Sequence, residues 1–103
     1  NRSSPGARLA SVLAHSDSAA RIGRAALAGG FVERDVRGLL AGLAGSIPDL
    51  DALLRDGGDD DVRAALDVAR RREFAAPGAA VLRIDGWIVA PTEARACALI
   101  ALA

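Results

Sequence analysis

The chain has 103 residues, of which 51% are hydrophobic and 25% charged, so it suits one globular domain with a modest core and is too apolar to be disordered. Its 13 basic and 13 acidic side chains cancel, which removes the long-range field that draws in nucleic acid or an anionic membrane. One cysteine excludes an internal disulfide and a cysteine-based metal cluster, and the sequence has no apolar run of membrane-spanning length.

Only 3% of the residues are aromatic, and every basic residue is an arginine. This bias indicates a GC-rich, bacterial genome and predicts a core of small aliphatic side chains. We expect one helical domain over residues 1–103, ending in a hairpin-helix unit. The cytoplasm is the expected compartment, and the start at Asn1 leaves open export after removal of a leader.

Apolar residues at helical spacing predict a first helix over residues 7–15 and a second over 18–28. Ser16 or Asp17 suits the N-cap of the second helix. The glycine pair at 29–30 ends it, because glycine readily adopts the positive φ of a helix C-terminus. These two helices are expected to form a helical hairpin.

Three further helices are predicted over residues 32–47, 47–56 and 59–74. The first of them carries a broad apolar stripe. The last begins with three aspartates and ends with Arg70, Arg71 and Arg72, so the charges at both ends match the helix dipole.

The sequence changes period near residue 80. Two short apolar runs flank Asp85 and Gly86, a dipeptide typical of the two-residue type I′ turn of a β-hairpin. In that register Ile84 faces Trp87 and Leu82 faces Val89 on one apolar side, while Arg83 faces Ile88 on the other.

A final helix follows Pro91, with Thr92 as its expected cap. From Ala96 to Ala103 it is apolar all round and must therefore be buried on every side. The predicted fold is mainly α: about five helices forming a small bundle, a single β-hairpin near residues 80–90, and a buried C-terminal helix.

No pattern of catalytic or metal-ligating residues emerges. His15 is expected at a helix C-terminus, where Ser16 and Asp17 are its chain neighbours and cannot converge on it as a triad. Cys97 is expected to be a buried small hydrophobe. The acidic stretch over residues 49–61 departs from the calcium-loop pattern, so we predict no catalytic residue, no metal and no cofactor.

The arginines at 70–72 form the densest basic cluster. They are candidate ligands for a phosphate or another anion. The alternative is a solvated helix end, because Asp67 and the helix dipole already balance two of the three charges.

Glycines at 38, 42 and 45 follow one line of their helix, opposite the apolar stripe. Each mid-helix glycine costs about 1 kcal/mol relative to alanine. Either a close approach by another helix or partner offsets that cost, or the glycines are tolerated on a solvated face, and the sequence leaves both interpretations open.

The leading hypothesis is a noncatalytic interaction or accessory module that binds a protein, as a homo-oligomer or as part of a complex with a larger subunit. Its basis is an expected apolar surface larger than one small core covers, together with the unpaired hairpin edges. The predicted interface residues are Trp87, Ile84, Val89, Leu82, Leu99 and Ile100.

Two alternatives remain. Residues 18–45 could form a helix-turn-helix DNA-binding unit with the later hairpin as a wing. Glu33 and Asp35 in the expected recognition helix, and Asp85 at the hairpin tip, argue against nucleic acid as a partner. The third hypothesis is a small-ligand carrier or small enzyme with a pocket between the hairpin and the helices.

Overall fold

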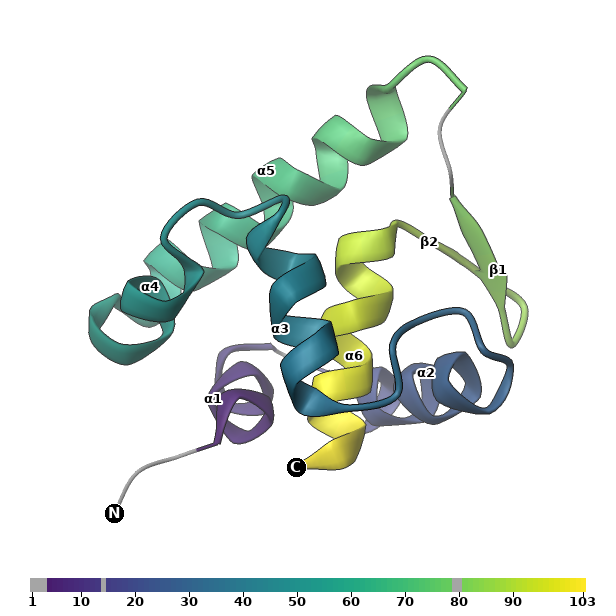
Figure 1. Ribbon diagram of the computed structural model, residues 1–103, viewed down its shortest axis with the longest axis horizontal. Coiled ribbons are helices and arrows are strands. Elements are labelled where there is room, and N and C mark those ends of the chain that lie inside the picture. The colour runs from purple at the N-terminus through teal and green to yellow at the C-terminus, as the bar shows by residue number, and fades with distance from the viewer. Residues whose placement is uncertain (1–3, 14, 79–80) are drawn as a thin grey trace.

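The computed structural model describes residues 4–13, 15–78 and 81–103. Within these residues the fold is mainly α-helical, as predicted, with a two-stranded antiparallel sheet (Figure 1). Residue 80, where the first strand was expected to begin, lies outside the described residues. The elements in chain order are α1 (Pro5–Val12), α2 (Ser16–Ala28), α3 (Val36–Ala44), α4 (Leu50–Asp56), α5 (Asp59–Ala75), β1 (Leu82–Ile84), β2 (Trp87–Val89) and α6 (Pro91–Leu102).

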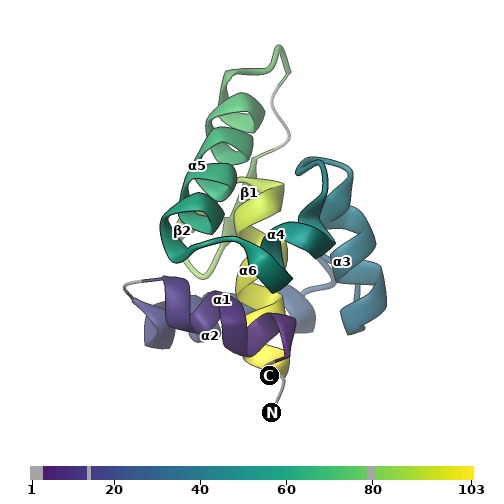
Figure 2. The same cartoon turned by 90° about the vertical axis from the view of Figure 1, so that its left-hand side faces the viewer.

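The C-terminal helix α6 is the central element. It runs through the middle of the molecule, and α1, α2, α3 and α5 pack against it from different sides (Figures 1 and 2). The predicted burial of this helix is therefore confirmed as far as Ile100, and helices of the same chain provide the cover, whereas Leu102 and Ala103 at its end are exposed. The buried residues of α6 are Thr92, Ala94, Ala96, Cys97, Ala98, Leu99 and Ile100.

Two glycines bring neighbouring helices onto the backbone of α6. A Cβ atom at Gly23 of α2 would overlap the carbonyl oxygen of Cys97, and one at Gly6 of α1 would overlap that of Leu99. Only a residue without a side chain permits such an approach. Both helices therefore pack against the main chain of α6 as well as its small side chains.

The end of α2 and the start of α3 have clear local causes. The amide of Phe31 donates to the carbonyl of Ala26, and Gly30 has a φ of 71°, so a Schellman motif ends α2 where the glycine pair predicted. The third helix begins later than predicted, because the Asp35 carboxylate accepts a hydrogen bond from the Gly38 amide at 2.6 Å and caps it there.

The hairpin has the predicted register. Asp85 and Gly86 have φ values of 52° and 82°, as a type I′ turn requires, and Ile84 pairs with Trp87. Ile84 and Val89 are buried, and β1 packs on α2. The hairpin thus closes one side of the core.

The cap of α6 differs from the prediction. Thr92 lies inside the helix, where its amide donates to Glu73 Oε1 at 2.8 Å and its hydroxyl donates to Glu73 Oε2 at 2.6 Å. Ser46 also donates to Glu73 Oε2, at 3.1 Å. A carboxylate of α5 therefore caps α6 and joins three segments that are remote in sequence.

Two arginines cap helix C-termini across the fold. Arg8 of α1 donates to the carbonyls of Leu54 and Gly57 at the end of α4 and pairs with Asp59. Arg63 of α5 donates through Nε and one terminal nitrogen to the carbonyl of Val12, at 3.2 and 2.9 Å. Both side chains satisfy carbonyls that a helix end leaves without an intrahelical partner.

Gly23→Ala should destabilise the protein by about 1–3 kcal/mol or more, because the added methyl must push α2 away from the backbone of α6. Chemical denaturation followed by circular dichroism would measure the loss. Gly45→Ala is the matched control: Gly45 is exposed, caps α3 with φ −65°, and faces only a carbonyl of its own helix. An equal effect of the two substitutions would contradict the packing argument.

Glu73→Ala should cost about 1–3 kcal/mol of unfolding free energy, because the buried amide and hydroxyl of Thr92 lose their acceptor. Glu73→Gln keeps one carbonyl acceptor and should cost less. Denaturation midpoints of the two variants test this order. A midpoint of Glu73→Ala equal to that of the unmodified chain would show that the capping contact does not stabilise the fold.

Candidate interaction surface

Most of the predicted interface residues belong to the core. Ile84, Val89, Leu99 and Ile100 are buried among the chain's own helices, so their side chains do not reach the surface. Leu82 is half-buried and packs against the same core. Trp87 differs from all of these, because 54% of it is exposed.

The exposed apolar residues of the hairpin are Val81, Trp87 and Ile88, and we call them the hairpin surface. Ile88 is 55% exposed on the side of the sheet that faces away from the core, and it pairs there with Arg83. The predicted register placed Ile88 on this outer side, but the choice of interface residues left it out. The exposure of a large apolar side chain beside Trp87 is the signal that this choice missed.

The outer edge of β2 has few backbone amides and carbonyls that could pair with a strand of a partner. Residues 84 and 87 flank the two-residue turn and form a hydrogen-bonded pair in such hairpins, so the amide and carbonyl of Ile88 point away from β1. Two residues further along, the amide of Ala90 donates to Glu93 Oε1 at 3.1 Å. Side-chain contact must therefore supply most of any binding energy at this edge, because short edge strands pair weakly.

The arginine cluster is partly neutralised by its own helix. Arg70 and Arg71 both pair with Asp67, at 2.8 and 2.7 Å, and the hydrogen bond from Arg70 is the main cause that lowers the pKa of that carboxyl. Arg72 is exposed and forms none of the ion pairs recorded among the described residues. Arg70 and Arg72 line different cavities, and anion binding by the three arginines stays a prediction.

The line of glycines on α3 faces a side chain of the same chain. The Arg95 guanidinium lies directly over Gly42, and its Nε donates to Glu33 Oε1 at 3.0 Å. This hydrogen bond is the main cause that lowers the pKa of Glu33. Gly42 therefore makes room for an ion pair that joins the α2–α3 loop to α6, while Gly45 is exposed.

The segment predicted as a helix-turn-helix has a different geometry. Seven residues, 29–35, separate α2 from α3, whereas helix-turn-helix units use a turn of three or four residues. Both helices pack chiefly on α6. Glu33, which was expected in the recognition helix, lies before α3 and pairs with Arg95.

The groups considered for chemistry are far from an active-site arrangement. His15 was expected at the end of the first helix but occupies the N-cap position of α2, because α1 ends at Val12. Cys97 is buried as predicted, and burial, with a smaller contribution from Glu93, raises the pKa of its thiol to about 12. Within residues 4–13, 15–78 and 81–103, no group of three metal-ligating side chains comes together, and no helix is long and apolar enough to cross a membrane.

Comparisons with known proteins identified no relative of this chain. No family model, no curated protein and no solved structure matched the chain.

The Cys97 thiol should resist alkylation by iodoacetamide at pH 8 in the folded protein and react readily in denaturant. Its ordinary pKa of 9.0 applies to the unfolded chain, so between pH 9 and about 12 the unfolded state releases a proton that the folded state retains. Stability contributed by this group is fully present below pH 9 and is lost as the pH rises. Mass spectrometry of the alkylated chain measures the reactivity, and rapid labelling of the folded protein would contradict its burial.

Proposed function

We propose that this chain is a noncatalytic protein-protein interaction module that contacts a second copy of itself through the hairpin surface. The observation that supports the proposal is the exposure of Trp87 and Ile88 on neighbouring positions of β2. Their side chains leave opposite faces of the strand, so a partner contacts both only at the edge of β2. Exposed aromatic and large aliphatic side chains are typical of protein interfaces.

The arrangement of the hairpin favours contact between identical surfaces. β1 packs on α2, while β2 packs chiefly on β1 and presents its outer side chains to solvent. A two-fold axis beside β2 would place Ile88 of one copy against Ile88 of the other, with both Trp87 rings at the margin. Such a contact is self-complementary and closes at two subunits.

A larger subunit is the other partner that the same surface would fit. It would use the same apolar side chains, so variants of Trp87 and Ile88 test both versions of the proposal.

Sedimentation velocity over a range of concentrations should show a monomer-dimer equilibrium for the unmodified chain. Ile88→Arg should weaken association at least tenfold, because it places two like charges across the two-fold axis. Val68→Arg is the matched control, since Val68 is a β-branched residue that is 50% exposed on α5, away from the hairpin.

A strict monomer at millimolar concentration would exclude the self-association version. A pull-down with the chain as bait, repeated with Trp87→Ala, would then test the version with a larger subunit. Partners retained equally by both baits would contradict a role for the hairpin surface.

A further inference from the structure

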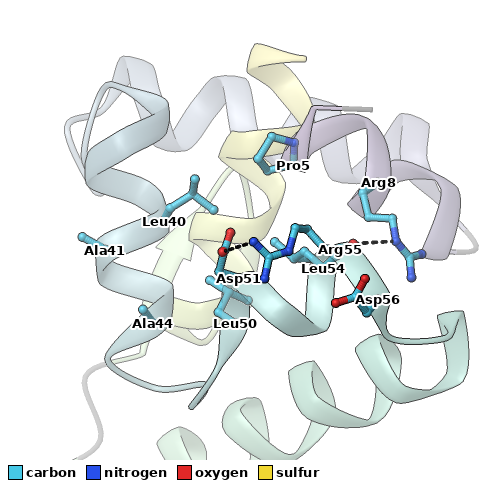
Figure 3. Close-up of a pocket in the computed structure, with 10 residues that line it drawn as sticks. All are labelled: Pro5, Arg8, Leu40, Ala41, Ala44, Leu50, Asp51, Leu54, Arg55 and Asp56. Atoms are coloured by element: carbon cyan, nitrogen blue, oxygen red, sulfur yellow. Dashed lines mark hydrogen bonds and ion pairs between the residues drawn. The ribbon is translucent and has the colours of Figure 1, made fainter. Parts of the chain in front are cut away.

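A groove of about 1040 Å³ lies between α1, α3 and α4 (Figure 3). These three helices lie on a different part of the molecule from the hairpin (Figure 1). Leu40, Leu50 and Leu54 contribute its apolar lining together with small residues of α3. On the side of α3, the groove is bordered by Ala41 and Ala44, which are both exposed. Because these side chains are small and apolar, the wall of the groove on that side is shallow and apolar. The lining residues are Pro5, Arg8, Leu40, Ala41, Ala44, Leu50, Asp51, Leu54, Arg55 and Asp56.

The charged side chains of the groove are not equally available to a ligand. Arg8 is mostly buried and is held by Asp59 and two carbonyls, and Arg55 pairs with Asp51 at 3.0 Å (Figure 3). Asp56 lines the groove and forms none of the ion pairs recorded among the described residues. The unbalanced charge in the groove is therefore negative.

The surroundings of the groove strengthen this negative potential. Residues 49–61 contain six aspartates and one arginine, a formal charge of −5 in a chain whose total is zero. Arg8 and Arg63 pair with Asp59 and Asp60, which leaves a balance of about −3 spread over α4 and the first turn of α5. The positive end of the α5 dipole offsets only about half a charge of this.

An apolar floor with an acidic rim is complementary to one kind of partner. An amphipathic helix packs its apolar face into such a groove through residues spaced at i, i+3, i+4 and i+7. Basic side chains at the edge of that face would meet the carboxylate of Asp56, whereas acidic ones would be repelled by it.

We infer that the groove between α1, α3 and α4 is a docking site for a basic amphipathic helix of another protein. The inference rests on the groove and its charge, independently of the proposed contact at the hairpin surface. Electrostatic attraction favours rapid encounter, and the leucine side chains of the groove provide the apolar contact.

A labelled 14-residue lysine-leucine peptide, with leucines at helical spacing, is the probe. Fluorescence anisotropy should show saturable 1:1 binding that weakens as the salt concentration rises, because the rim is exposed and screened by ions. A peptide with glutamate in place of each lysine should bind at least tenfold more weakly. Asp56→Asn should also weaken binding of the lysine-leucine peptide.

Ala44→Arg should reduce the affinity at least tenfold, because it places a bulky cation on the wall of the groove. Ala75→Arg is the matched control: it is also exposed, it also ends a helix, and it adds the same net charge outside the groove. Equal effects of the two substitutions would overturn the docking site and leave only attraction by net charge.

Amide chemical shifts on peptide addition locate the contact. Changes confined to α1, α3 and α4 support the groove. Changes confined to the hairpin, or no saturable binding of the lysine-leucine peptide, would overturn the inference. Sedimentation of the Ile88→Arg variant remains a separate measurement, so failure of the groove and failure of the hairpin surface are distinguishable.

Discussion

The contact of two helix backbones with α6, at Gly6 and Gly23, is the constraint on which the rest of the fold depends. It lets α1 and α2 lie close enough to bury the small side chains of α6 on two sides. Alanines alone bring little apolar area to a core, so close packing must replace the volume that larger side chains would supply. The remaining sides of α6 are then covered by α3 and α5 (Figures 1 and 2).

Polar contacts fix the helices around this centre. Glu73 joins α5 to the start of α6, and the pair of Glu33 with Arg95 joins the α2–α3 loop to the same helix. Arg8 and Arg63 satisfy carbonyls at the ends of α4 and α1. Many of the charged side chains thus form contacts within the fold. The hairpin surface and the acidic groove between α1, α3 and α4 remain accessible to a partner.

Local chemistry made several elements predictable. Asp85 with Gly86 determined the turn and hence the register of the hairpin, because both positions require positive φ. The exposure of Trp87 could not be predicted in the same way. Alternation along β2 puts Trp87 on the same side of the sheet as the buried Val89, yet about half of Trp87 is exposed. The exposure of a strand residue depends on how far the neighbouring helices extend under the hairpin.

The sequence by itself determined that the helix after Ala96 must be largely buried, because no side of it is polar, and that the glycine pair at 29–30 would end α2. Only the tertiary structure decided what buries that helix and what caps it. Gly23 packs against the backbone of Cys97, and Glu73 accepts a hydrogen bond from Thr92. Both pairs are too far apart in the sequence for a local pattern to predict their contact. The physical reason is that packing and capping depend on which surfaces meet in space, whereas periodicity and turn chemistry act between near neighbours in the chain.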